Sequence, residues 1–95
     1  MQFILTAWDG NDEEAAVRRM NAREKHLSNV RRLKEEGHFI WGGALLDDNK
    51  NMKGSVVVYE YESRKEFDMM LKDEPYMKAR VWHYVDIQNF KLADI

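Results

Sequence analysis

The fold is decided within residues 54–71, GSVVVYEYESRKEFDMML, where the apolar pattern changes its period. Gly54 to Tyr61 is rich in β-branched and aromatic side chains, which predicts a β-strand. Ser63 to Glu66 has the S-x-x-E form of a helical capping box, and apolar residues follow at helical spacing from Phe67. A strand that passes almost directly into a helix is therefore expected.

Two further strands are predicted upstream of this stretch. Residues 3–8, FILTAW, are apolar and partly β-branched, and the turn-prone residues 9–12 end that strand. Residues 38–46, HFIWGGALL, predict another strand, and the polar residues 47–53 predict a loop that leads into the strand beginning at Gly54. These two neighbouring strands are expected to form a hairpin with a long loop.

A long helix is expected between the first two strands. Residues 13–36 are rich in Ala, Glu, Arg, Lys and Leu, and their apolar side chains recur at helical spacing. Asn11 or Asp12 is expected to cap the start, and Gly37 is placed to end the helix in a left-handed conformation. Asn21 is a candidate break within the helix.

The rest of the chain completes the topology. Pro75 is expected to stop the second helix and to open a further turn at residues 76–80. A last strand is expected from Val81 or Trp82 to about Phe90. The order β-α-β-β-α-β predicts an α+β, ferredoxin-like protomer with an antiparallel sheet and both helices on one face.

Both faces of the predicted sheet carry apolar side chains. Three strands show this pattern: Phe3, Leu5 and Ala7 oppose Ile4 and Trp8; Val57, Tyr59 and Tyr61 oppose Val56 and Val58; Val85 and Ile87 oppose Trp82, Tyr84 and Phe90. Because the helices cover only one face, the other face is expected to pack on the same face of a second subunit, which makes a homodimeric α+β barrel. The alternative is that these aromatic residues decorate the surface.

The composition predicts one domain, residues 1–95, in a cytoplasmic protein. With 44% hydrophobic and 34% charged residues the chain fits a globular domain, and no apolar run reaches the roughly 20 residues of a membrane span. The net charge of −2 argues against a nucleic-acid partner. Because cysteine is absent and the histidines form no close pair, no metal is expected, and because no G-x-G-x-x-G or P-loop motif is present, no other cofactor is expected.

His26 is the first candidate for chemistry. In the expected helix it borders the apolar stripe, and Arg23 and Arg19 precede it by one and two turns. An imidazole in such a place can act as a base, and an arginine can hold a substrate carboxylate. An ordinary boundary histidine on a charged helix fits the same spacing.

The acids before Pro75 are the second candidates. Asp73 or Glu74 can cap the turn that Pro75 opens, or can orient a nearby histidine through a hydrogen bond. Because the two helices are expected to lie side by side, a pair of His26 with Glu74 is a hypothesis that the topology permits. Ser55 can add a hydroxyl to such a site, or can serve only as a residue at the start of a strand.

Aromatic residues are numerous enough to line a pocket for a flat small molecule. The candidates are Trp8, Trp41, Tyr59, Trp82 and Tyr84. The same side chains fit a core or an interface equally well.

Several short motifs follow one another along the chain. They are Arg23-x-x-His26-Leu27, Glu36-Gly37-His38, Gly42-Gly43-Ala44-Leu45, Gly54-Ser55 and Asp73-Glu74-Pro75-Tyr76-x-x-Ala79. In this order, from Met1 to Phe90, they resemble the YciI-like, YCII-related family. The resemblance implies a dimeric α+β barrel of ferredoxin-like protomers and a histidine-aspartate dyad with a serine nearby.

By residue, the resemblance places the histidine on His26, the helix arginine on Arg23 and the serine on Ser55. The acid falls on Glu74, where the family usually has aspartate, so Asp73 is an alternative. The implied function is a cofactor-independent lyase or isomerase, similar to a dehydrochlorinase or a muconolactone isomerase, acting on a small cyclic or carboxylated metabolite. In it His26 would be the base, with either acid as its orienting partner.

Two other functions stay open. The first is a non-catalytic dimeric module that binds a small ligand in the same cleft, which the glutamate at Glu74 favours. The second is a cofactor-free oxygenase of the wider dimeric α+β barrel group, which would use the aromatic pocket, including Trp8 and Trp41, more than the dyad.

Overall fold

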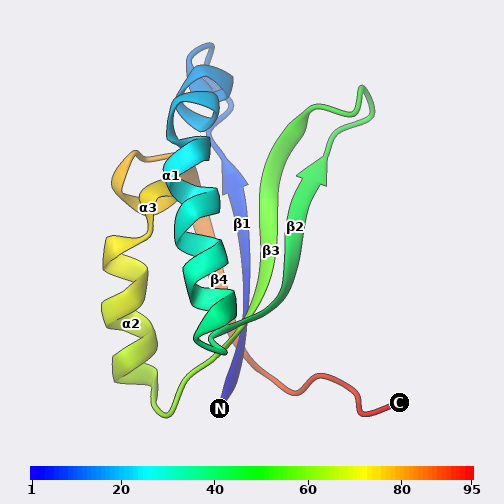
Figure 1. Cartoon of the computed structure of the whole chain (residues 1–95). Coiled ribbons are helices and arrows are strands. Elements are labelled where there is room, and N and C mark those ends of the chain that lie inside the picture. Colours follow the sequence, from blue (N-terminus) through cyan, green and yellow to red (C-terminus); the bar gives the residue numbers. More distant parts are fainter.

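The computed structural model covers all 95 residues. It contains one antiparallel sheet with helices packed on it. The elements are β1 (Gln2–Asp9), α1 (Ala15–Glu35), β2 (Phe39–Leu46), β3 (Met52–Glu60), α2 (Arg64–Asp73), α3 (Pro75–Lys78) and β4 (Trp82–Phe90). The strand order is β2-β3-β1-β4, and the helices lie on one side of the sheet (Figure 1). The predicted α+β, ferredoxin-like protomer is therefore confirmed.

Local sequence signals set most of the helix ends. Gly37 follows α1 with φ at +83°, in the left-handed conformation that the sequence predicted. Ser63 Oγ accepts a hydrogen bond from the Glu66 amide at 3.2 Å, which confirms the cap of α2. Pro75 is the first residue of α3, again as predicted.

The start and the middle of α1 differ from the prediction. The N-cap residue is Glu14, and Asp12 instead accepts a hydrogen bond from the Glu14 amide and binds Arg18 through both carboxylate oxygens. The predicted break at Asn21 is wrong, because α1 continues from Ala15 to Glu35. One exposed asparagine costs a helix about 0.5 kcal/mol, which is less than the packing of α1 on the sheet contributes.

The hydrophobic core lies between the sheet and the helices. Phe3 and Leu5 of β1 are fully buried, and the Phe3 ring stacks on Phe67 of α2 with centroids 4.8 Å apart. Tyr59 of β3 is also fully buried in this layer, and Leu33 near the end of α1 is nearly so. This layer holds α1 and α3 in place, and those two helices carry the polar residues described below. No helix combines the length and apolar character needed to cross a bilayer.

A register shift at the end of β1 turns Trp82 toward the helices. Trp8 pairs with Tyr84 and Asp9 pairs with Trp82, so β4 has one extra residue, His83, opposite β1. The sequence predicted Trp82 on the same face as Tyr84, and this prediction is wrong because strict alternation does not allow for a β-bulge. The side chain of Trp82 is only 5% exposed and lies among polar groups under α1.

The face of the sheet opposite the helices carries exposed aromatic side chains. Trp41 is 57% exposed and Tyr84 60% exposed, and the Tyr84 ring lies 5.4 Å from that of Trp8. Asp86 and Gln88 follow Tyr84 at every second position of β4, so they lie on the same face and add polar groups to it. This face is therefore apolar mainly near Trp8, Trp41 and Tyr84.

Candidate active site

His26 and Glu74 meet between α1 and α3. Nδ1 of His26 lies 2.6 Å from Oε1 of Glu74, and the glutamate side chain is completely buried. The same oxygen accepts a hydrogen bond from the Tyr76 amide at 3.0 Å, and Oε2 accepts one from Asn29 Nδ2 at 3.2 Å. Glu74 thus caps α3 and also holds the imidazole, two roles that the sequence had posed as alternatives.

The contact with Glu74 decides which ring nitrogen of His26 is available. A carboxylate accepts a hydrogen bond from Nδ1–H, so the neutral imidazole carries its lone pair on Nε2. No group of the chain forms a hydrogen bond with Nε2. The imidazole lies parallel to the Tyr76 ring, with centroids 3.8 Å apart and an interplanar angle of 6°, and Trp82 contacts it edge-on. These contacts hold the ring in one orientation.

Asp73, the alternative acid, does not reach His26. Its side chain is 82% exposed, and its nearest charged partner is Lys78, with Nζ 3.8 Å from Oδ1. Asp73 is the last residue of α2, whereas Glu74 has an extended backbone that turns its side chain inward. One step along the chain therefore separates a solvent-exposed carboxylate from a buried one.

A second buried network lies beside this pair. Nη1 of Arg19 lies 2.9 Å from each carboxylate oxygen of Asp9, and Nη2 donates to Ser55 Oγ at 3.1 Å. Trp82 Nε1 donates to the same Ser55 oxygen at 3.0 Å. The Arg19 guanidinium also lies 4.9 Å from the centre of the Tyr76 ring, so Tyr76 contacts both networks.

Sequence reasoning did not find this second network. Asp9 was interpreted as a turn residue, and Arg19 was noted only as a neighbour of His26. The available signal was that Arg19 and His26 are seven residues apart and so share one side of α1. The partner of Arg19 is Asp9, and its position depends on how β1 pairs with β4, which the sequence pattern does not specify.

A hollow of about 140 Å³ joins residues of the two networks. His26, Arg23, Arg19 and Ser55 line it, together with apolar residues and the backbone of β2 near Gly42. Residue 42 has no room for a side chain, because a Cβ atom there would lie 2.8 Å from the Val56 carbonyl oxygen. The structure thus places three residues from the resemblance, His26, Arg23 and Ser55, around one small cavity, with Glu74 behind His26.

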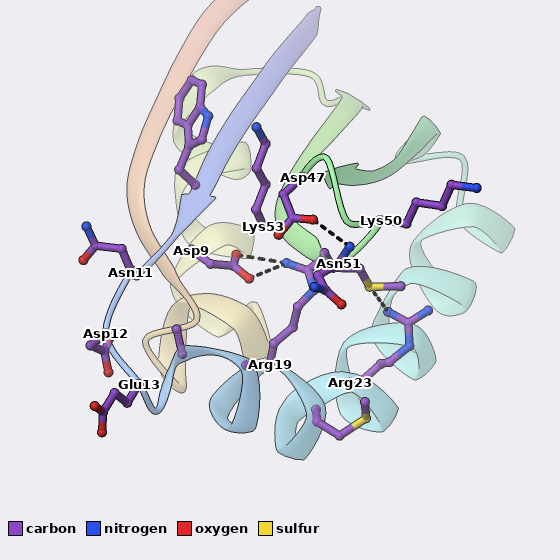
Figure 2. Close-up of a pocket in the computed structure, with 16 residues that line it drawn as sticks. Asp9, Asn11, Asp12, Glu13, Arg19, Arg23, Asp47, Lys50, Asn51 and Lys53 are labelled. Atoms are coloured by element: carbon purple, nitrogen blue, oxygen red, sulfur yellow. Dashed lines mark hydrogen bonds and ion pairs between the residues drawn. The ribbon is translucent and has the colours of Figure 1, made fainter.

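The hollow adjoins a larger cleft of about 890 Å³ that Arg19 and Arg23 also line. Figure 2 shows Arg19 reaching from α1 to Asp9, with Arg23 near the loop that connects β2 and β3. Arg23 has no carboxylate within salt-bridge distance, and its Nη1 lies 3.3 Å from the Met52 sulfur. Its positive charge is therefore available to an acidic ligand.

The aromatic candidates separate in the structure. Trp8 lines the larger cleft, but Trp41 lines neither cavity, since it pairs with Val58 and points to the other face of the sheet. Tyr59 is in the core, and Tyr84 lies on the open face. A register shift between Phe39 and Trp41 turns β2 and places Trp41 on the open face, so its contact with a substrate stays a prediction.

No group of three or more histidine, cysteine, aspartate or glutamate side chains has the geometry to hold a metal ion. The chemical groups around the hollow are an imidazole, a hydroxyl and two guanidinium groups. Such groups can move a proton and bind an oxygen or an anion.

A comparison with protein-family models identifies the family of this chain. The model of the YCII-related domain matches residues 1–91. The chain belongs to the YCII-related family. Protein YciI of Escherichia coli O6:H1 is 28% identical over 97 residues, covering 96% of this chain and 97% of the relative.

Solved structures share the fold of this chain. The 5-chloro-2-hydroxyhydroquinone dehydrochlorinase TftG from Burkholderia phenoliruptrix AC1100 superimposes with a TM-score of 0.83 at 26% identity, over 98% of this chain and 96% of that one. A putative antibiotic biosynthesis monooxygenase from Nitrosomonas europaea has a TM-score of 0.50 and 15% identity, over 92% and 84% of the two chains. The second likeness shows the fold alone.

Proposed function

We propose that this member of the YCII-related family is a cofactor-independent lyase or isomerase. It removes a proton from a carbon next to a carbonyl group in a small cyclic metabolite. The observation that carries the proposal is the 2.6 Å contact between His26 Nδ1 and the fully buried Glu74, which leaves the basic lone pair on Nε2 of a residue that lines the hollow. The residue types fit general base catalysis.

In the proposed reaction Nε2 of His26 takes the proton, and the electron pair of the broken C–H bond moves onto the carbonyl oxygen. Glu74 stabilises the imidazolium that forms. In an elimination the enolate pair then returns and expels an anion from the neighbouring carbon. In an isomerisation the imidazolium gives its proton back to another carbon of the same system.

Two further residues are proposed to hold the substrate. Ser55 lines the hollow and can contact the oxygen on which negative charge develops. Arg23 lies where the hollow adjoins the larger cleft and can bind an acidic substituent through its unpaired guanidinium. Trp8 lines the outer cleft and can pack against the flat part of a ligand.

The likeness to TftG supports a ring-shaped substrate. That protein is a dehydrochlorinase of 5-chloro-2-hydroxyhydroquinone and was crystallised with 2,5-dihydroxybenzoquinone. Loss of hydrogen chloride from this ring includes the removal of a proton, the kind of step proposed for His26; the ring has a proton on a carbon next to a carbonyl group in its keto tautomer. We therefore take hydroxylated six-membered rings as the first substrate class to test.

The test is chloride release from 5-chloro-2-hydroxyhydroquinone by the wild-type protein, His26→Gln and His83→Gln. His83 is an exposed histidine outside both cavities and serves as the matched control. We expect turnover by the wild type and by His83→Gln, and a loss of about 10²-fold to 10⁴-fold in His26→Gln. Equal turnover in His26→Gln would reject the proposed base.

Binding of 2,5-dihydroxybenzoquinone, measured by titration calorimetry, separates the catalytic function from simple ligand binding. Binding without turnover of any chlorinated or enolisable ring would favour the alternative of a non-catalytic module, for which the glutamate at Glu74 was the sequence argument. Absence of both binding and turnover would reject the substrate class.

We also propose that the protein is a homodimer in which the open sheet faces pack together. The support is that Trp8, Trp41 and Tyr84 are exposed on a face that no helix covers. Sedimentation equilibrium at micromolar concentration should give twice the chain mass of 11.3 kDa. A monomer, or a dimer unchanged by Trp41→Lys, would reject this arrangement.

A further inference from the structure

Ser55 has both of its acceptor positions occupied. Its Oγ accepts one hydrogen bond from Arg19 Nη2 at 3.1 Å and another from Trp82 Nε1 at 3.0 Å. A serine hydroxyl has two lone pairs and one proton. With both lone pairs used, the proton is the only hydrogen-bonding capacity that Ser55 has left.

The two donors to Ser55 are held in place. Asp9 binds Nη1 of Arg19 with both carboxylate oxygens at 2.9 Å, and the arginine is only 6% exposed. Trp82 is 5% exposed and is paired with Asp9 in the ladder between β1 and β4. Because neither donor can turn toward water without leaving a buried site, the two hydrogen bonds to Ser55 persist.

The proton of Ser55 has no acceptor within the chain. The hydroxyl takes part in two side-chain hydrogen bonds, and it is the acceptor in both. Ser55 is 3% exposed and lines the hollow of about 140 Å³ together with His26. A buried hydroxyl proton without a partner is unfavourable, so a ligand oxygen that accepts it in the hollow gains a hydrogen bond at no loss to the protein.

We infer that Asp9, Arg19 and Trp82 make Ser55 an obligate hydrogen-bond donor, so that the hollow selects a ligand oxygen that carries no proton. The fitting groups are a carbonyl, an enolate or a phenolate, and a hydroxyl that must itself donate is disfavoured. The cationic donor Arg19 polarises the hydroxyl and strengthens it as a donor. Asp9, Arg19 and Trp82 are positioning residues, since they act through Ser55.

This inference deepens the proposed function and rests on it for its catalytic meaning. His26 would take the proton from carbon, while Ser55 stabilises the oxygen that receives the electron pair. Removal of one such donor from an enzyme typically lowers kcat about 10²-fold to 10³-fold. The selectivity for an acceptor oxygen, however, is a binding property that does not require turnover.

The test is the affinity for 4-nitrophenolate, an acceptor-only oxygen on a flat ring, measured by absorbance titration in alkaline buffer. Four proteins are compared: the wild type, Ser55→Ala, Trp82→Phe and the double variant. Trp82→Phe keeps an aromatic ring at this buried position and removes the N–H donor together with one ring of the indole. We expect Ser55→Ala to weaken binding about tenfold to a hundredfold, and Trp82→Phe about threefold to tenfold.

The double variant gives the decisive result. If Trp82 acts through Ser55, Trp82→Phe should have no further effect when Ser55 is already alanine. An equal effect of Trp82→Phe in both backgrounds, or no detectable binding at millimolar 4-nitrophenolate, would overturn the inference. Ser28→Ala, at an exposed position of α1, is the matched serine control and should bind as the wild type does.

Two measures keep the outcomes separate. Thermal unfolding checks that each variant is folded. If Trp82→Phe is not folded, Arg19→Lys is used in its place, because lysine keeps the positive charge beside Asp9 but lacks the forked guanidinium donor. Chloride release by His26→Gln reports on the proposed function. If phenolate binding depends on Ser55 but no turnover is found, this inference stands and the proposed enzyme function is rejected. If turnover depends on His26 but Ser55→Ala does not reduce it, the enzyme function stands and this inference is rejected.

Discussion

Replacement of Glu74 by glutamine separates the charge of this residue from its shape. The side chain is fully buried and accepts three hydrogen bonds, from His26, Asn29 and Tyr76. Glutamine keeps the volume and can still accept from His26 Nδ1–H and from the Tyr76 amide. Its NH₂ group would face Asn29 Nδ2, and Asn29 cannot turn freely because its Oδ1 accepts from Arg32 at 2.6 Å. One hydrogen bond is therefore lost, which costs about 1 kcal/mol of unfolding free energy.

The expected effect on the reaction is much larger than the effect on stability. When His26 becomes an imidazolium, the carboxylate of Glu74 stabilises it by about 4 kcal/mol, taking an effective dielectric constant of about 20 and about 4 Å between the charges. Glutamine removes this charge–charge stabilisation, and its amide dipole restores part of it. We expect kcat to fall about 10²-fold to 10³-fold, with a melting temperature lower by about 4–8 °C.

The assay is the chloride release described above, with thermal unfolding followed by circular dichroism. Asp73→Asn is the matched control, since it removes the neighbouring carboxylate, which is exposed and distant from His26. Turnover of Glu74→Gln within threefold of the wild type, with a folded protein, would refute the role of the buried charge. A comparable loss in Asp73→Asn would show that the wrong carboxylate has been assigned.

Three other predictions address binding, alkaline stability and helix capping. Arg23→Gln should raise KM about tenfold with little change in kcat, because it removes a contact made equally in the ground and transition states; a pure kcat effect would contradict this. Burial raises the pKa of the Tyr61 hydroxyl to about 12 and the pKa of the Tyr59 hydroxyl well above its usual value. Because the unfolded chain loses these protons at lower pH than the folded protein does, the free energy of unfolding should fall as pH rises from about 10 toward 12. Tyr59→Phe should reduce that alkaline loss and, by removing a buried hydroxyl without a partner, add about 1 kcal/mol at neutral pH, which denaturant titration would measure. Ser63→Ala should destabilise the protein by about 1 kcal/mol through loss of the α2 cap, and no change in the urea midpoint would show that the cap is not needed.

The two carboxylates of Glu74 and Asp9 illustrate how site geometry arises. Both lie at the end of an element, Glu74 between α2 and α3 and Asp9 at the end of β1, and both bind a side chain of α1. His26 and Arg19 are two turns apart on that helix, so the two pairs lie beside one another. α1 is therefore the element that positions the candidate base and also the donor to Ser55.

The sequence by itself determined the order of elements and most of their ends, because periodicity, the Ser63 cap, Gly37 and Pro75 act over a few residues. It also indicated His26, Glu74 and Ser55 as candidates through the family resemblance. Their chemical roles remain proposals, but the structure shows that His26 contacts Glu74 and that Ser55 lines the same hollow.

Only the tertiary structure decided which carboxylate faces inward, which face Trp82 and Trp41 occupy, and that Asp9 and Arg19 meet at Ser55. The choice between Asp73 and Glu74 depends on one backbone turn, and the positions of the two tryptophans depend on register shifts of one residue. Such shifts reverse the direction of a side chain without changing the local pattern of apolar residues. They are settled by the packing of the whole sheet against α1 and α3.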